Sequence, residues 1–465
     1  MHSVKSKTPI ADSLLELQEV TKHSFHALPI FNGNSIANSE FSENYQALIG
    51  GNMLTSELTT NGHLFDSFFF PKAAILESEM LAANLFGADG TLYVTTGTTT
   101  SNHIAANALF EQGPVLMDKN CHQSLHFVFH TLKAKVDYLQ PAFHCEKSGR
   151  SAWNMESFLD VVREAEQAGC GYEIIVLTAQ SYEGVIYDIP KIMRALLDSG
   201  VRTRRFLIDE AWGSANYFNP ELREISAMNI DALIEQYPEL EVVCTQSAHK
   251  SLSALRQGSM IHFRGGKELR ERLNIAKFRF HTTSPSYPIL ASLDLAQAQM
   301  ASEGAWRVTQ AIELAEAFKT KLQNDINLSF YHICQMPNLG NMSPFVKQDP
   351  CKLSINIESL CMDACDVQAY LFREHGVYVN RFTNHSILLN FHIGISQSAV
   401  DAILTGLAEL QRKQVAKAMK KNHSGCFVIP YPPGVPLLVP GELITEAIQS
   451  QIEAIQNAGI ALLKI

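Results

Sequence analysis

The stretch Ser247-Ala-His-Lys250-Ser-Leu-Ser-Ala-Leu-Arg-Gln-Gly-Ser259 decides the fold that this sequence predicts, because of the segment that precedes it. The apolar run 241–246 has the length and composition of a buried strand, so Lys250 lies in a small-residue turn at the carboxyl end of a strand. In open α/β sheets, ligands bind at that end of the strands. A lysine amine in such a turn, flanked by His249 and Ser247, is suited to form a Schiff base with an aldehyde while its neighbours hold a phosphate.

Strand-like and helical segments alternate on both sides of this turn. Apolar runs predict the strands, and segments of helix-forming residues lie between them. Such alternation is typical of an α/β fold in which a mostly parallel sheet is covered by helices on both faces. The expected strands span 91–96, 114–118, 135–139, 173–178, 205–209, 241–246 and 259–263, and the expected helices include 72–86, 154–168 and 189–199.

A Gly/Thr turn, Gly97-Thr-Thr-Thr-Ser-Asn102, follows the strand at 91–96 and precedes a helical run that we expect to begin at His103. The amide groups at a helix start and the positive end of the helix dipole favour a bound anion. Together with the hydroxyls of Thr98 and Thr99, they predict a phosphate site. The alternative is an ordinary helix N-cap that binds no ligand.

Two more strand ends carry polar side chains at the same predicted edge of the sheet. His122 follows the strand at 114–118, and Asp209 ends the strand at 205–209. A carboxylate there either binds a metal ion or keeps a proton on a pyridine nitrogen. Because no histidine and carboxylate cluster with metal-ligand spacing lies nearby, we expect the second role and no metal site. The alternatives are a packing or surface histidine and an N-cap aspartate.

These four features fit one cofactor. Lys250 would form the Schiff base, and Asp209 would pair with a ring nitrogen. His122 would stack on the flat ring, with Ala211 packed on the ring's other face. The phosphate would be held by Thr98, Thr99, Ser247 and His249. This is the binding inventory for pyridoxal 5′-phosphate (PLP).

The composition argues against several classes of function. The chain has 37 basic and 47 acidic residues, a net charge of −10, which disfavours nucleic acid or an anionic membrane as a partner. No apolar run reaches the ~18 residues of a membrane span. No continuous apolar segment follows the charges of the N-terminus, so we expect no signal peptide. The nine cysteines are scattered without a CxxC motif, which predicts a reduced, cytoplasmic protein.

The chain has 465 residues, 46% of them apolar, and is long enough for two or three domains. Leucines near helical spacing predict an arm helix at 11–23, and the phenylalanine-rich, irregular segment 24–70 favours a role in wrapping a partner. The predicted parts are this arm at 1–70, a PLP-binding large domain at 71–288, a connecting helix at 289–323 and a C-terminal α+β domain at 324–465.

Several stretches of the chain, taken together, match the pattern of a known family. They are Gly97–Asn102, Asp118–His126, Tyr182–Gly184 with Tyr187, Asp209–Trp212, Ser247–Lys250 with Gln257–His262, Thr283–Tyr287 and Tyr431–Glu442. In these stretches, and in their order, the sequence resembles the prokaryotic ornithine/lysine/arginine decarboxylase group of fold-type-I PLP enzymes. The resemblance runs from about residue 71 to the C-terminus, and its Ser-x-His-Lys and Tyr-Pro-Pro-Gly-x-Pro-Leu motifs are specific in combination.

The resemblance implies PLP-dependent decarboxylation of an amino acid, most simply lysine, ornithine or arginine, to an amine and CO₂. It implies catalytic roles for Lys250, Asp209 and His122. The cofactor-binding residues that it implies are Gly97, Thr98, Thr99, His122, Asp209, Ala211, Trp212, Ser247, His249, Lys250 and Thr283. It also implies a homodimer with shared active sites, in which Thr283 or Ser284 reaches the neighbouring cofactor. Larger members carry an N-terminal receiver-like domain, which we expect to be absent here because only about 90 residues precede the Gly/Thr turn.

The chain departs from the family's pattern near the expected substrate and dimer entrance. The N-terminal His-x-Pro-Gly-His pattern is missing, and the usual Asn-Ser-Thr-Tyr-Asp-Gly run appears as Ala179-Gln-Ser-Tyr-Glu-Gly184. Gln123 stands where a lysine usually follows the stacking histidine. A dibasic substrate also needs a distal anion, for which Glu442 in the Pro-Gly-Glu turn is our candidate. The alternative for Glu442 is a solvent-exposed residue at a helix start.

Two other kinds of function stay open from the sequence. One is a different PLP reaction on the same scaffold, such as that of an aminotransferase, a Cα–Cβ lyase or an acyl transferase, because the orientation of the substrate decides which bond breaks. The other is a non-catalytic, PLP-binding regulatory protein, since a fold does not fix a function.

Overall fold

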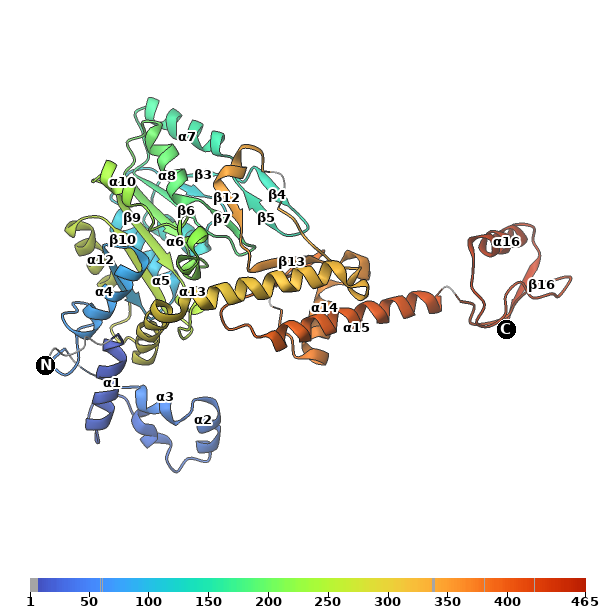
Figure 1. Ribbon diagram of the computed structural model, residues 1–465, viewed down its shortest axis with the longest axis horizontal. Coiled ribbons are helices and arrows are strands. Elements are labelled where there is room, and N and C mark those ends of the chain that lie inside the picture. The colour runs from blue at the N-terminus through green and yellow to red at the C-terminus, as the bar shows by residue number, and fades with distance from the viewer. Residues whose placement is uncertain (1–6, 59, 61, 337–338, 380, 422) are drawn as a thin grey trace. The chain divides into compact units, whose positions relative to one another are not determined.

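The computed structural model of the chain describes residues 7–58, 60, 62–336, 339–379, 381–421 and 423–465 (Figure 1). The chain divides into two compact units. The first consists of Met1–Ala315, Gln335–Leu353 and Asn390–Ile395. The second consists of Glu316–Cys334, Ser354–Leu389 and Ser396–Ile465. Two short segments of the predicted C-terminal domain therefore belong to the first unit, and the predicted boundaries at 71 and 324 stay predictions.

A seven-stranded sheet forms the centre of the first unit (Figure 1). Its strand order is β1-β10-β9-β8-β6-β2-β3, and the five strands from β9 to β3 are parallel. Only β10 runs antiparallel to its two neighbours. The mostly parallel sheet predicted from the sequence is thus confirmed. The strands are β1 (Gly90–Val94), β2 (Val115–Asp118), β3 (Val136–Leu139), β6 (Ile174–Thr178), β8 (Arg205–Asp209), β9 (Glu241–Gln246) and β10 (Ser259–Arg264).

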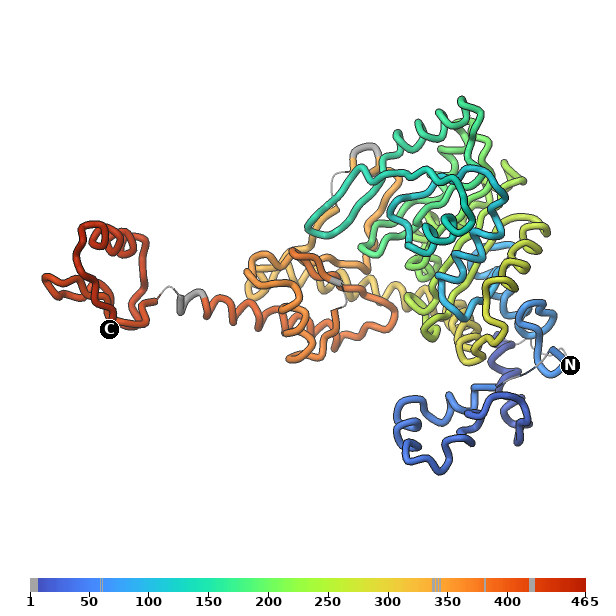
Figure 2. Tube along the Cα trace, turned by 180° about the vertical axis from the view of Figure 1, so that it is seen from behind, coloured from blue at the N-terminus to red at the C-terminus, as the bar shows by residue number. Residues whose placement is uncertain are grey.

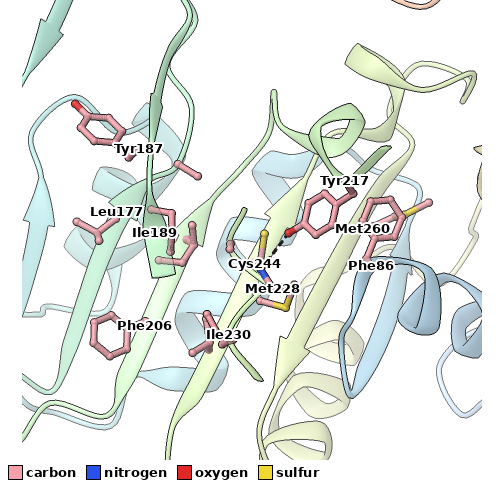
Figure 3. Packing of buried hydrophobic residues seen from close by; sticks show 14 of the residues in the cluster. Phe86, Leu177, Tyr187, Ile189, Phe206, Tyr217, Met228, Ile230, Cys244 and Met260 are labelled. Atoms are coloured by element: carbon pink, nitrogen blue, oxygen red, sulfur yellow. Dashed lines mark hydrogen bonds between the residues drawn. The ribbon is translucent and has the colours of Figure 1, made fainter. Parts of the chain in front are cut away.

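Helices cover both faces of this sheet, as the buried runs of the strands require. In β8, Phe206 and Ile208 belong to one apolar cluster, part of which Figure 3 shows, whereas Leu207 belongs to a second cluster on the other face. The helices of the first unit are α1 (Pro9–Val20), α2 (Ser42–Leu48), α3 (Gly51–Ser56), α4 (Ala74–Phe86), α5 (Thr98–Leu109), α6 (Gln123–Thr131), α7 (Met155–Gln167), α8 (Ile189–Asp198), α9 (Pro220–Arg223), α10 (Asp231–Gln236), α11 (Ala248–Ser251), α12 (Lys267–Phe280) and most of α13 (Tyr287–Asn324). Short 3₁₀ helices span Phe31–Ile36, Ser214–Phe218 and Gly340–Phe345, and short strands are β4 (Phe143–Cys145), β5 (Arg150–Ala152), β7 (Val185–Tyr187) and β12 (Val346–Gln348).

Helix α5 begins at Thr98 and not at His103, so the expected start of this helix was wrong by five residues. Gly97 makes the turn with a φ of +85°, which a residue with a side chain rarely adopts. The chain can therefore enter the helix directly after the strand. The threonines that suggested a loop instead form the first turn of the helix, where their hydroxyls lie close to the helix start.

Within the first unit, the N-terminal segment is held to the rest of the unit at two buried points. The backbone amides of Ile10 and Ala11, at the start of α1, donate to the Asp294 carboxylate at 2.9 and 3.0 Å. The second point is the fully buried Lys277 on α12, whose Nζ donates to the carbonyl of Phe68 at 3.0 Å and lies 3.6 Å from a Glu79 oxygen. A buried ammonium without such partners is costly, so the arm is needed to satisfy the core of the unit.

The second unit contains a four-stranded sheet with the order β11-β13-β15-β14. Its strands are β11 (His332–Ile333), β14 (Arg381–Phe382) and most of β13 (Lys352–Asn356) and β15 (Ser386–Asn390), whose residues 352–353 and 390 belong to the first unit. Helix α14 (Ala364–His375) packs on α15 (Gln397–Lys421). Short 3₁₀ helices span Ile326–Leu328 and Glu358–Leu360. The C-terminal segment, red in Figure 2, pairs β16 (Val428–Tyr431) with β17 (Ala461–Lys464) around α16 (Glu446–Asn457).

Candidate active site

The predicted site residues of the large domain follow the carboxyl ends of parallel strands. Asp209 is the last residue of β8, and it pairs with Thr178 of β6 and Thr245 of β9 in the sheet. Ser247 and Lys250 follow β9 directly, and a short turn connects His122 to the end of β2. The sheet therefore brings these groups to one edge, where open α/β sheets bind their ligands.

The Asp209 carboxylate is buried and accepts a hydrogen bond at each of its oxygens. The Asn102 side-chain amide donates to Oδ2 at 3.1 Å, and the Ala211 backbone N–H donates to Oδ1 at 3.0 Å. Both partners are uncharged donors. The arrangement presents a fixed carboxylate with acceptor capacity left for one more donor.

A chain of hydrogen bonds joins this carboxylate to His122. The Asn102 amide also donates to the Ser124 hydroxyl at 2.9 Å, which lies 2.8 Å from His122 Nδ1, and Nδ1 accepts from the Ser124 backbone N–H at 3.3 Å. In a neutral His122 ring the proton is therefore on Nε2. The Thr245 hydroxyl also donates to the side-chain oxygen Oδ1 of Asn102, at 2.6 Å. Nothing in the sequence marks the role of Asn102 beyond its place in the Gly/Thr turn, although it lies one helical turn after Thr98.

Asn102→Ala should weaken cofactor binding without removing a group that contacts the cofactor. The substitution leaves Asp209, Ser124 and Thr245 each without one buried partner, which costs about 1–3 kcal/mol per group left unsatisfied. We expect the Kd for PLP, measured by absorbance titration of the apoprotein, to rise at least about tenfold. Thr100→Ala, on the same helix, removes a hydroxyl that donates to the Thr96 carbonyl at 3.2 Å; it is the matched control and should bind PLP normally. Equal affinities for both variants would contradict the role given to Asn102.

Glu210, the residue after Asp209, points away from the site into the core. Its carboxylate accepts from the Tyr217 hydroxyl, the Gln246 amide and the Ala227 N–H at 2.8 to 3.1 Å. Burial raises the pKa of Glu210, and these hydrogen bonds oppose the shift. The two neighbouring carboxylates thus have separate tasks, because successive side chains of a strand end point to opposite faces.

The start of α5 meets the turn after β9. The buried Thr98 hydroxyl lies 2.5 Å from the Ser247 hydroxyl and 2.9 Å from that of Ser259. Thr99 is exposed at the first turn of the helix. His249 is half-buried and donates from Nδ1 to the Gly258 carbonyl at 2.8 Å, and burial lowers its pKa. Four of the residues predicted to hold a phosphate therefore lie on two neighbouring segments.

Lys250 lies in a pocket beside aromatic rings. Its Nζ is 4.5 Å from the centre of the Trp212 ring, and the Trp212 and Tyr182 rings pack edge to face with 5.0 Å between their centres. Burial lowers the pKa of Lys250, and the Asp209 carboxylate offsets part of this shift. A lysine whose amine gives up its proton more readily than usual is what a nucleophilic amine requires. The pocket is also lined by Ser251 and by residues that the sequence did not mark, among them Asn216, Asp349, Lys352, Asn390 and His392.

Three more predicted residues, Thr283, Ser284 and Glu442, are exposed. Thr283 and Ser284 are exposed in the segment between α12 and α13. Glu442 is exposed in the second unit, and its carboxylate accepts from the Val439 N–H at 3.0 Å, which closes its own turn. The roles given to these three residues stay predictions.

The residues present fit PLP. Lys250 is a largely buried amine near a buried carboxylate, as the aldehyde and the ring nitrogen of the cofactor require. At Gly97, no atom of the described residues beyond its chain neighbours lies within 4 Å of the place a Cβ would take, which leaves open space at the helix start. Within the described ranges, no three histidine, cysteine or carboxylate side chains are grouped so that they could hold a metal ion. Of the helices in those ranges, none is long and apolar enough to cross a membrane.

Comparison with known proteins agrees with this geometry. The family model for the Orn/Lys/Arg decarboxylase major domain matches residues 8–399. The arginine decarboxylase of Bacillus subtilis is 27% identical over 454 residues, which cover 90% of this chain and 88% of that protein. The constitutive lysine decarboxylase of Escherichia coli is 26% identical over 89% of this chain but only 61% of its own length. The crystal structure of the Francisella novicida lysine decarboxylase has the same fold, with a TM-score of 0.76, 22% identity and coverage of 97% of this chain and 77% of that one.

Fold, site and family model together define the class: this is a PLP-dependent decarboxylase of fold type I. The chain belongs to the Orn/Lys/Arg decarboxylase family. The resemblance, the fold class, the enzyme class and the cofactor expected from the sequence are thereby confirmed.

Proposed function

We propose that this protein decarboxylates a dibasic amino acid, namely lysine, ornithine or arginine, to the corresponding amine and CO₂. Family membership and relatives named arginine and lysine decarboxylases support this substrate class. The observation that carries the proposal is the arrangement of Lys250, with its lowered pKa, over Trp212 and near the doubly hydrogen-bonded Asp209.

Each of these residues has a task in the proposed reaction. The amine of Lys250 would hold PLP through the aldehyde of the cofactor and would take the cofactor back as the product amine leaves. Asp209 keeps a proton on the ring nitrogen, and His122 stacks on the ring. The PLP ring, once bound, accepts the electron pair that CO₂ leaves behind. A fixed carboxylate beside a protonated ring nitrogen in a site shielded from water favours that charge shift.

We also propose that the remaining cofactor contacts follow the sequence prediction. Thr98, Thr99, Ser247 and His249 hold the phosphate, which is supported by their position at the start of α5 and in the turn after β9. Ala211 packs against the ring, and its backbone bond to Asp209 supports that position. Glu442 remains our candidate for the anion that binds the distal cation of the substrate.

The protein is proposed to work in the cytoplasm as a homodimer with shared active sites, where Thr283 or Ser284 contacts the partner's cofactor. Family membership supports this assembly, and so does the exposure of both residues next to α13. Light scattering should give about twice the chain mass of 51.6 kDa. A stable, active monomer would contradict the shared site.

The first experiment is an absorbance spectrum of the purified protein, followed by addition of lysine, ornithine, arginine and neutral amino acids while CO₂ is monitored. A visible PLP band that shifts with one dibasic amino acid, with release of CO₂, supports the proposal. A shift without CO₂, with formation of a keto acid, would move the assignment to an aminotransferase. A band that no amino acid shifts would favour the non-catalytic alternative.

A further inference from the structure

A second buried lysine, Lys352, lies in the same pocket as Lys250. Its side chain is almost fully buried, and its Nζ is 4.0 Å from the centre of the same Trp212 ring. The ammonium donates to the carbonyls of Ser181 and Tyr182 at 3.2 and 3.0 Å. Lys352 therefore ties the turn at 181–182 to the indole that packs beside Lys250.

The surroundings hold Lys352 firmly in this place. Asp349 is buried and accepts from the Cys351 N–H at 2.8 Å and from the Gln180 amide at 2.6 Å. Asn216 donates to the Gln180 oxygen at 2.9 Å, so this network is anchored at both ends. Gly184 packs directly against Lys352, and a side chain at this position would clash with it, because a Cβ there would lie 2.8 Å from the Lys352 Cβ. A buried charge held this closely has a defined position relative to its neighbours.

The two lysine nitrogens are close enough to influence each other. Each lies within 4.5 Å of the Trp212 ring centre, so they are less than about 9 Å apart. At that distance, with an effective dielectric constant of about 20, one unit charge shifts the pKa of another group by about one unit.

Several other titratable groups face this pair. Asp209 faces Lys250 from the end of β8, and His249 precedes it in the turn. Burial lowers the pKa of Lys352 to about 8, opposed by the charges of Asp349 and Glu183 and reinforced by that of Lys250. Cys351 also acts on Lys352 and opposes the shift, and burial lowers the pKa of the pocket residue His392, which keeps that ring neutral near pH 7.

We propose that Lys352 is a positioning residue for Lys250, which holds Trp212 and the turn at 181–182 in place and whose positive charge disfavours a proton on the Lys250 nitrogen. This inference rests on the proposed attachment of PLP to Lys250. Lys250 and Lys352 lie far apart in the sequence. Below about pH 8 the charge of Lys352 is present, and it favours the unprotonated nitrogen on which exchange with an incoming amino acid depends.

The test compares the pH dependence of the visible PLP absorbance in three forms of the holoenzyme: wild type, Lys352→Gln and Lys352→Arg. Glutamine keeps a donor for the carbonyls of Ser181 and Tyr182 but removes the charge, and arginine keeps the charge at all pH values. We expect the midpoint of the absorbance change to rise by about one pH unit in Lys352→Gln. In Lys352→Arg it should stay at the wild-type value or fall below it.

Lys191→Gln is the matched control. Lys191 also donates to a backbone carbonyl, that of Pro344 at 3.0 Å, and lies 5.1 Å from an aromatic ring, but it is exposed and outside the pocket. Its replacement should leave the midpoint unchanged. A merely structural role for Lys352 would change stability but not the midpoint.

An unchanged midpoint in Lys352→Gln would overturn the inference, and so would a higher midpoint in Lys352→Arg. Where the glutamine variant fails to fold, Lys352→Met, which also removes the charge, replaces it, and an unchanged midpoint in that variant would overturn the inference. A midpoint that follows charge while CO₂ release is absent would support the inference and count against the proposed reaction. Absence of any visible band from the wild type would overturn the proposed function and this inference with it.

Discussion

Turnover and the visible PLP band should both disappear in Lys250→Ala. The side chain of Lys250 is the amine that reaches the pocket beside Trp212, and burial together with Asp209 sets its proton affinity. Alanine removes the amine that would attach the cofactor and would rejoin it at the end of each cycle. We expect kcat to fall by at least about 10³, as is usual when a nucleophile is removed. CO₂ release and the absorbance spectrum measure the two effects.

The matched control for this variant is Lys191→Ala, which removes an exposed lysine and should leave both readouts unchanged. Circular dichroism of Lys250→Ala should match that of the wild type, because the buried Asp209 carboxylate keeps its hydrogen bonds from the Asn102 amide and the Ala211 N–H. Wild-type turnover in Lys250→Ala would refute the mechanism.

Asp209→Asn should lower kcat by about 10²–10³ while the cofactor still attaches to Lys250. Both oxygens of Asp209 accept hydrogen bonds, from Asn102 and from the Ala211 N–H. An asparagine at this position has only one acceptor oxygen, so its NH₂ group must face one of these donors. It also lacks the charge that keeps the ring nitrogen protonated. The visible band should therefore persist while its shape and the rate of CO₂ release change.

Glu210→Gln provides the comparison for Asp209→Asn. It makes the same chemical change at the next residue, but in a carboxylate that bonds to Tyr217, Gln246 and Ala227 in the core. We expect a loss of about 1–3 kcal/mol in the free energy of unfolding, measured by denaturant titration, and nearly normal kcat. Equal kinetic losses in the two variants would show that the effect is structural.

The features predictable from the sequence were those that depend on neighbours along the chain. Strand and helix periods gave the parallel sheet, and the position of Lys250 after an apolar run placed it at the carboxyl edge. Asp209 and His122 could be placed by the same rule. The start of α5 was misjudged because threonines are common in loops, whereas Gly97 lets the chain turn within one residue.

The features that could not be predicted depend on contacts between distant segments. The role proposed for Asn102 depends on its hydrogen bonds to Ser124 and Asp209, which are 22 and 107 residues away in the sequence. Lys352 reaches the site because the segment Gln335–Leu353 belongs to the first unit, although it follows part of the second unit in sequence. A single lysine in an apolar strand has no pattern that would distinguish a core position from an active-site position.

The hydrogen bond from Lys277 to the carbonyl of Phe68 cannot form early in the synthesis of the chain on the ribosome. The two partners are 209 residues apart, and the arm is synthesised first. At ribosomal rates of about 5–20 residues per second, Phe68 leaves the ribosome roughly 10–40 seconds before Lys277 does. During that interval the phenylalanine-rich arm lacks its anchoring cation and exposes apolar surface. The nascent chain is therefore most vulnerable to aggregation and to chaperone capture until α12 has emerged.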